Sequence, residues 1–213
     1  MEYPVNLRLE GRRCLVVGGG GVAERKVDSL LQAGALVTVI SPILTPALEM
    51  RAVRAEIDWL QREFAAGDLR SAFVVIGATN DTEVNAAVAA EARQIGALVN
   101  IVDTPALCDF TVPAQVQRGD LLLTVSTNGK SPVMSRRIRE ELEELYGPEY
   151  GQFLVLASRL REDIKQRLAS PGERELFWRQ ALDREIISFL RQGMLEEAEE
   201  RLRNVVSRIG TES

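Results

Sequence analysis

The chain has 213 residues, of which 46% are hydrophobic, and it carries a formal net charge of −5 with a pI near 5.1. This length suffices for one sizeable core, or for a domain of about 110 residues with an appendage. The acidic balance argues against a protein that binds nucleic acid independently of sequence. No apolar run approaches the roughly 20 residues of a membrane span, and no apolar leader opens the chain. We therefore expect a cytoplasmic protein that contacts neither membrane nor nucleic acid.

The chain contains no histidine, which excludes Ser-His-Asp and Cys-His catalysis and every histidine-based metal site. Proton transfer must then depend on Asp, Glu, Lys, Tyr or the substrate itself. The two cysteines, Cys14 and Cys108, are far apart in sequence and form no C-x-x-C pair. We expect both to stay reduced, Cys14 to lie in a strand core, and no dedicated metal site.

The first half of the chain alternates short apolar runs with amphipathic segments, which is typical of a parallel α/β sheet. Gly34 and Gly96 follow two of the amphipathic segments, where glycine commonly ends a helix. We expect strands at 12–17, 36–40, 57–61, 73–78 and 97–102, and helices at 22–33 and 82–94.

The pattern changes after residue 103. Two apolar runs, 110–116 and 121–126, predict a hairpin with its turn at 117–120. Ser131 is a good N-cap and Pro132 suits the first helical position, so a helix is expected from there to about Tyr146. The remainder is strongly charged, with Glu and Arg at i,i+4 spacing. It predicts three helices, at 150–168, 174–191 and 195–208.

Four glycines stand between the first strand and the first helix. Gly18, Gly20 and Ala23 give the spacing G-x-G-x-x-A within CLVVGGGGVAERK. In a strand-turn-helix unit the first glycine allows the turn, the second lets backbone approach a pyrophosphate, and the third position permits close packing. The alternative is a glycine-rich turn without a ligand. It leaves unexplained why four glycines stand together, since each is entropically costly.

The second strand lacks a usual feature of an NAD site. An Asp or Glu commonly ends this strand and binds the ribose hydroxyls. Here the sequence is Ser41, Pro42 and Ile43. We expect Ser41, with backbone around Pro42 and Ile43, to hold the ribose. The choice between NAD and NADP does not follow from these residues alone.

Polar residues follow two further strands, at the sheet edge where doubly wound proteins bind ligands. Asp103 comes just past what we expect to be a central strand, and it is the best candidate for a general base. The alternative is a turn aspartate bonded to nearby backbone. Thr79 and Asn80 follow the fourth strand and are candidates to line the dinucleotide. The alternative is that residues 80 and 81 only turn the chain and cap the next helix.

The segment STNGKSPV precedes an arginine-rich helix. A helix start beside cationic groups is suited to carboxylates or phosphates. The alternative for the arginines is a solvated helix face paired with glutamates. The candidate anion-binding, and hence substrate-binding, residues are Asn128, Gly129, Lys130, Ser131 and Arg136.

Taken together, these motifs resemble a known family. CLVVGGGGVAERK, GATND, NIVDTP, FTVPA, STNGKSPV and GERELFW occur in this order across essentially the whole chain. The sequence is similar to precorrin-2 dehydrogenase, a module that also forms the N-terminal half of bacterial siroheme synthase. No methyltransferase half follows here, so the chain resembles the stand-alone form.

The resemblance implies an α/β chain with three parts: a Rossmann-like NAD-binding domain at 1–112, a small central α+β dimerisation domain at 113–148, and a helical C-terminal domain at 149–213. It also implies a homodimer that uses NAD to oxidise precorrin-2 to sirohydrochlorin, with Asp103 as the general base. The family's cofactor contacts fall on Gly21, Val22, Pro42 and Ile43.

The resemblance also aligns Ser131 with a serine that is phosphorylated in some siroheme synthases.

Two alternative functions stay open. Some relatives also insert ferrous iron into sirohydrochlorin, and a dinucleotide-sensing regulatory module would share the glycine loop without needing a substrate.

Overall fold

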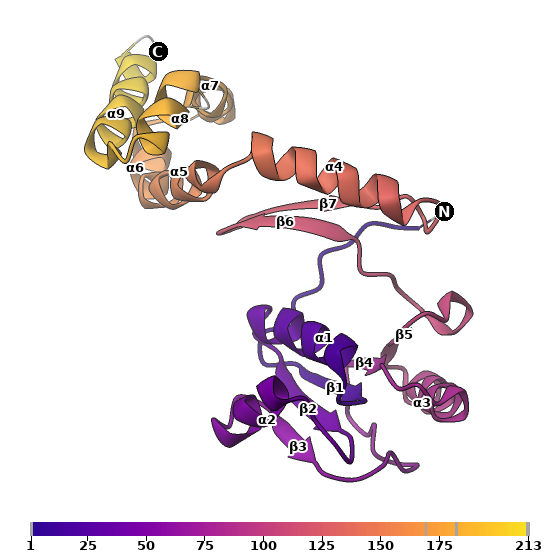
Figure 1. Ribbon diagram of the computed structural model, residues 1–213. Coiled ribbons are helices and arrows are strands. Elements are labelled where there is room, and N and C mark those ends of the chain that lie inside the picture. Colours follow the sequence, from indigo (N-terminus) through magenta and orange to yellow (C-terminus); the bar gives the residue numbers. More distant parts are fainter. Residues whose placement is uncertain (1, 169, 182, 212–213) are drawn as a thin grey trace. The chain divides into compact units, whose positions relative to one another are not determined.

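The computed structural model describes residues 2–168, 170–181 and 183–211 (Figure 1). Contacts within the chain define two compact units, Glu2–Val112 and the part from Pro113 onward. Each unit is described by itself. The division into three domains at residues 112 and 148 stays a prediction.

The first unit is built on a parallel sheet of five strands. Its spatial order is β3-β2-β1-β4-β5, and every neighbouring pair is parallel. The strands are β1 (Arg13–Val17), β2 (Leu36–Ile40), β3 (Asp58–Leu60), β4 (Val74–Gly77) and β5 (Leu98–Ile101). The prediction of a parallel α/β sheet is confirmed. The order of the strands reverses between β1 and β4, which is where ligands bind in such sheets.

Side chains of β1 alternate between two apolar clusters, one on each face of the sheet. Cys14 and Val16 pack with α1 (Gly21–Gln32) and α2 (Pro46–Val53), whereas Leu15 and Val17 pack with α3 (Thr82–Ile95). Both faces are therefore covered, which explains why the strands are almost continuously apolar. Cys14 lies in the strand core as expected, and burial raises its pKa to about 11.

Helix α2 was not among the predicted elements. Its start nevertheless carries ordinary signals, because Thr45 caps it by accepting a hydrogen bond from the Leu48 N–H at 3.3 Å, and Pro46 occupies the first position. The apolar periodicity of only eight residues was too short to reveal it.

The second unit begins with the expected hairpin. Strands β6 (Ala114–Arg118) and β7 (Leu121–Val125) pair antiparallel, and α4 (Pro132–Leu145) packs against them (Figure 1). The first strand was predicted to begin at 110, but 110–113 form no strand. The turn is shorter than predicted, and Gly119 in it has a φ of +58°.

The C-terminal part holds five helices within the described residues, where three were predicted. They are α5 (Pro148–Arg159), α6 (Arg161–Arg167), α7 (Pro171–Ala181), α8 (Arg184–Arg191) and α9 (Leu195–Thr211). Leu160 separates α5 from α6, yet it is buried in the same cluster as both helices. The apolar pattern therefore continues across the break and hides it. In the described part of the chain, no helix is both long and apolar enough to cross a membrane.

Candidate functional site

The glycine loop is held tightly by its neighbours on one side. Gly18 has a φ of +117°, and a Cβ there would overlap the backbone carbonyl oxygen of Ala78. A Cβ on Gly19 would overlap the carbonyl oxygen of Ile43. The Gly19 carbonyl accepts a hydrogen bond from the Thr45 N–H at 3.0 Å. Only glycine fits these two positions, because backbone from two other segments meets the loop here.

The opposite side of the loop is open. A Cβ on Gly20 or Gly21 would meet no atom within 4 Å, and both residues are exposed. Gly20 is the N-cap of α1, and among the described residues no side chain caps this helix start. The first-turn N–H groups and the positive end of a 12-residue helix therefore face open space. These features fit a dinucleotide pyrophosphate.

The segment after β2 borders the glycine loop. Ser41 is only 6% exposed, and its hydroxyl donates to the Ile43 carbonyl at 2.7 Å. The Trp59 indole N–H donates to the Ser41 carbonyl at 2.9 Å. Pro42 and Ile43 are exposed, and Ile43 exposes 76% of its surface. Ser41 thus shapes the loop, while Pro42 and Ile43 present apolar surface. A role for these three residues in holding the ribose stays a prediction.

The turn after β4 contains Thr79 and Asn80. Thr79 Oγ1 lies 3.0 Å from Asn85 Oδ1, and the Asn85 amide donates to the Thr79 carbonyl at 3.0 Å. Asp81 caps α3 by accepting from the N–H groups of its first turn at 2.8 and 3.1 Å. The capping role thus belongs to Asp81, and Asn80 is exposed. Asn85 is buried and holds this turn in place, a role that the sequence did not predict. Dinucleotide contact by Thr79 and Asn80 stays a prediction.

Asp103 follows β5, which is an edge strand and not the central strand that was predicted. Linear order in the sequence does not reveal spatial order in a sheet, which explains the error. Asp103 still lies at the carboxyl edge of the sheet, as do the glycine loop after β1 and Thr79 after β4. Its side chain is exposed and its φ is +58°.

The chain after Asp103 turns back beside β5. Asp109 exchanges two hydrogen bonds with Val99, since its N–H donates to the Val99 carbonyl at 2.8 Å and its carboxylate accepts from the Val99 N–H at 3.1 Å. The buried Asn100 donates to the Phe110 carbonyl at 2.9 Å. Sequence reasoning missed these residues, although an asparagine inside the apolar run LVNI was a usable signal.

One cation lies near this returning segment. Burial lowers the pKa of Lys26 on α1, and the charge of Arg25 lowers it further, while Cys108 acts in the opposite direction. Lys26 is half-buried.

The candidate substrate-binding residues lie in the second unit. The Ser131 hydroxyl accepts from the Met134 N–H at 3.2 Å, so its predicted role as an N-cap is confirmed. Asn128 and Gly129 form the preceding turn with φ values of +51° and +73°, and Lys130 is exposed. Arg136 Nε donates to a Glu140 carboxylate oxygen at 2.9 Å.

That arginine matches the alternative of a solvated helix face. The Arg136 side chain is 77% exposed, and its hydrogen bond is the main cause that lowers the pKa of Glu140. Arg137 pairs with Glu141 in the same i,i+4 manner. Substrate binding by the five residues from Asn128 to Arg136 stays a prediction.

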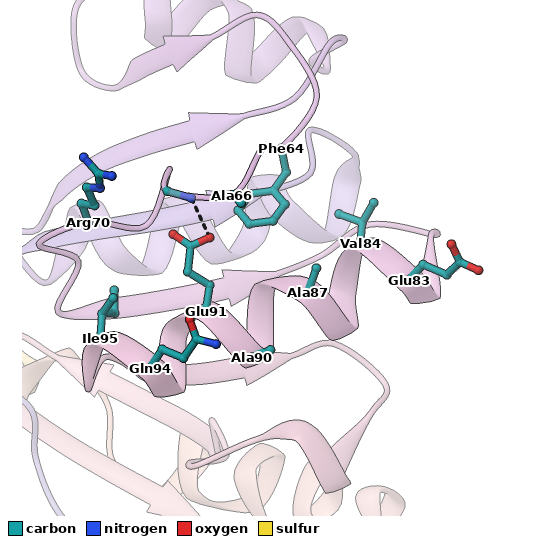
Figure 2. Close-up of a pocket in the computed structure, with 11 residues that line it drawn as sticks. Phe64, Ala66, Arg70, Glu83, Val84, Ala87, Ala90, Glu91, Gln94 and Ile95 are labelled. Atoms are coloured by element: carbon teal, nitrogen blue, oxygen red, sulfur yellow. Dashed lines mark hydrogen bonds between the residues drawn. The ribbon is translucent and has the colours of Figure 1, made fainter.

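A separate open groove of about 660 Å³ runs along the outer side of α3 (Figure 2). Its floor is small and apolar, with Ala87 and Ala90 on the helix and Phe64 on the facing loop. Glu91 points from the helix to that loop and accepts from the Gly67 and Leu69 N–H groups, each at 3.0 Å. None of the predicted site residues lines this groove.

Three family models match successive parts of the chain. Residues 5–114 match the family described as putative NAD(P)-binding, which is more than half of the chain. Residues 118–145 match the central region of a sirohaem biosynthesis protein, and 149–205 match the sirohaem synthase dimerisation region. The matched dimerisation region, 149–205, therefore lies directly after the segment 113–148, to which the resemblance assigns dimerisation.

Individual proteins give the same picture. The chain is 40% identical over 203 residues to siroheme synthase 1 of Serratia proteamaculans and to siroheme synthase of Photorhabdus laumondii. Each match covers 95% of this chain and 43% of the relative, so the chain spans less than half of their length. A solved structure titled "SirC, precorrin-2 dehydrogenase" is similar with a TM-score of 0.77 and 29% identity, and the match covers 99% of this chain and 100% of that one.

Proposed function

We propose that this chain, which belongs to the putative NAD(P)-binding family, is a precorrin-2 dehydrogenase that uses NAD to form sirohydrochlorin. It also matches the central region of a sirohaem biosynthesis protein and the sirohaem synthase dimerisation region. The full-length likeness to a structure with that title supports the activity. The matched dimerisation region supports a homodimer, which we place in the cytoplasm.

The observation that carries the proposal is the pairing of an anion site with a carboxylate at one edge of one sheet. Gly20 and Gly21 leave the start of α1 open toward solvent, and the exposed Asp103 follows β5 at the same edge. Bound there, NAD supplies a hydride acceptor. Oxidation of precorrin-2 removes a hydride and a proton, so a base is needed beside the acceptor.

The residues of the chain then have distinct roles. The N–H groups at the start of α1 bind the pyrophosphate, and Ser41, Pro42 and Ile43 border the ribose. Asp103 accepts the proton released from the substrate carbon. Its carboxylate suits this role because it is exposed, and within the described ranges no group donates a hydrogen bond to it.

The second unit supplies complementary charge. Precorrin-2 carries eight carboxylates, and the start of α4 at Ser131 offers N–H groups and a positive dipole end. Lys130 adds an exposed cationic side chain on the same segment, and Arg136 adds a second one where it exchanges its bond to Glu140 for a substrate carboxylate. We assign this segment to binding of the substrate carboxylates.

The test is turnover of precorrin-2 by the purified chain with NAD, followed by the absorbance of sirohydrochlorin. We expect Asp103→Asn to lower kcat by about 100-fold, a typical effect of losing a general base, and to leave the Kd for NAD unchanged. Asp120→Asn is the matched control, because Asp120 is an exposed aspartate in the hairpin turn. NAD binding without any turnover would refute the enzyme assignment and support a sensing module. Full activity in Asp103→Asn would refute the role of that residue.

A further inference from the structure

Asp103 occupies a turn position that most side chains avoid, although aspartate tolerates it better than most. The Ile101 carbonyl accepts a hydrogen bond from the Thr104 N–H at 3.3 Å, so residues 101–104 form a β-turn with Asp103 in the third position. Its φ of +58° is the left-handed geometry for which turns favour glycine or asparagine at this position. Holding a residue with a Cβ there costs on the order of 1 kcal/mol. Surrounding contacts must therefore hold the turn.

The thiol of Cys108 contacts this turn on both sides of Asp103. Its Sγ accepts from the Ile101 N–H at 3.2 Å. The same sulfur lies 3.2 Å from the Ile101 carbonyl oxygen and 3.4 Å from the Thr104 carbonyl oxygen. With a single proton, the thiol donates to one of these carbonyls at a time. It thus braces the residues that flank the carboxylate.

The segment that carries Cys108 is held in place by contacts of its own. The short 3-10 helix η1 (Pro105–Leu107) brings the chain back, and the Cys108 N–H donates to the Pro105 carbonyl at 3.1 Å. The next residue, Asp109, is held to Val99 by two hydrogen bonds, and its other carboxylate oxygen lies 3.9 Å from Arg93 on α3. These contacts do not involve the thiol. Loss of the thiol should therefore loosen the turn and leave the returning segment in place.

We propose that Cys108 is a positioning residue for Asp103, which holds the carboxylate where it takes the proton from the substrate. The proposal rests on the dehydrogenase function, because it assigns Cys108 an effect only through the base. Hydrogen bonds to sulfur are long and weak, so the thiol restricts the turn without locking it. A displacement of about 1 Å at a reacting group can reduce a rate by up to about 100-fold.

The experiment compares Cys108→Ala with Cys108→Ser in the full chain. We expect Cys108→Ala to lower kcat by about tenfold, with the KM for precorrin-2 and the Kd for NAD within about twofold of the original values. Serine can still accept and donate, so Cys108→Ser should recover kcat to within about threefold. Cys14→Ala is the matched control, because it removes the other thiol from a buried strand at a distance from the turn.

A second background separates positioning from general damage. If Cys108 acts through Asp103, Cys108→Ala should change kcat by less than about twofold when Asp103 is already Asn. Additive losses in the two variants would overturn the proposal, as would an unchanged kcat in Cys108→Ala.

Amide hydrogen exchange provides a readout that needs no turnover. The N–H groups of 102–104 should exchange faster in Cys108→Ala than in Cys108→Ser, whereas that of Val99 should not change. Equal exchange in both variants would overturn the brace itself. A chain that binds NAD but never turns over precorrin-2 fails at the proposed function instead, and the exchange result then distinguishes the two failures.

Discussion

Gly20→Ala should weaken NAD binding without weakening the fold. A Cβ at Gly20 meets no protein atom within 4 Å, so the new methyl group projects into the space assigned to the pyrophosphate. Gly18→Ala is the opposite perturbation. At Gly18 the φ is +117° and the methyl group would overlap the Ala78 carbonyl, so the backbone around Gly18 must shift and stability is lost.

The magnitudes follow from the local geometry. Alanine is a poorer N-cap than glycine by about 0.5–1 kcal/mol, but it restricts the unfolded chain by about the same amount, so Gly20→Ala should change stability by less than about 0.5 kcal/mol. Loss of one charge-assisted N–H contact costs about 1.5–3 kcal/mol, which is a Kd about 10- to 100-fold higher. For Gly18→Ala, backbone strain and overpacking together cost about 3 kcal/mol.

The assay measures two quantities on each purified variant. Titration calorimetry gives the Kd for NAD, and thermal unfolding without NAD gives Tm for the NAD-binding unit. Gly20→Ala should shift Tm by no more than about 4 °C, whereas Gly18→Ala should lower it by about 15 °C. Gly172→Ala is the control, because Gly172 lies in α7 with open space around it and should alter neither quantity.

Two results would refute the reasoning. An unchanged Kd in Gly20→Ala would mean that the phosphates do not approach this backbone, and the glycine loop would then be only a turn. A large loss of Tm in Gly20→Ala would mean that the space beside it is not open in solution. Either result removes the basis for placing the dinucleotide at the start of α1.

Three other substitutions test interactions that stabilise each unit by itself. Arg191→Met removes the partner of Glu149, whose pKa is lowered because the hydrogen bond from Arg191 at 2.6 Å, with backbone N–H groups, outweighs the opposing effect of burial. The bond therefore stabilises the fold above about pH 4.5, and this stabilisation is lost as the pH falls through the lowered pKa of Glu149. In urea titrations, Arg191→Met should lower the free energy of unfolding by about 1–2 kcal/mol at pH 7 and by less toward pH 3. Asp81→Ala removes the cap of α3 and should cost about 1 kcal/mol in the same titration, with no loss if solvent caps the helix equally well. Leu202→Ala opens a cavity in the helical core and should cost about 3 kcal/mol while the Kd for NAD stays unchanged; a weakened Kd would contradict the separation of the two units.

Local patterns in the sequence sufficed for the parts of the site that one strand-turn-helix unit determines. The glycine spacing before α1 and the N-cap at Ser131 are local features of the sequence, and both were predictable. The close approach of Ala78 and Ile43 to the loop was not, because those residues belong to other segments. The edge position of β5 was not, because strand order depends on how the whole sheet assembles. Asn100 and Cys108 were missed for a related reason, since their partners are fixed only when the chain turns back beside β5.

Missed helix boundaries have a different origin. The interruption at Leu160 leaves that side chain in the same apolar cluster as its neighbours, so hydrophobic periodicity carries no mark of it. Helix α2 shows the reverse case. Its capping signal at Thr45 was present, but its apolar pattern was too short to be read.

The returning segment beside β5 also limits how this protein can associate. A free edge strand presents unpaired N–H and carbonyl groups to which a strand from another chain can add. Here the Val99 and Ile101 N–H groups are already taken by Asp109 and Cys108. The opposite edge, β3, is only three residues long. Neither edge strand therefore offers a long row of free backbone groups with which a strand of another chain could pair. This protects the NAD-binding unit from strand-mediated aggregation.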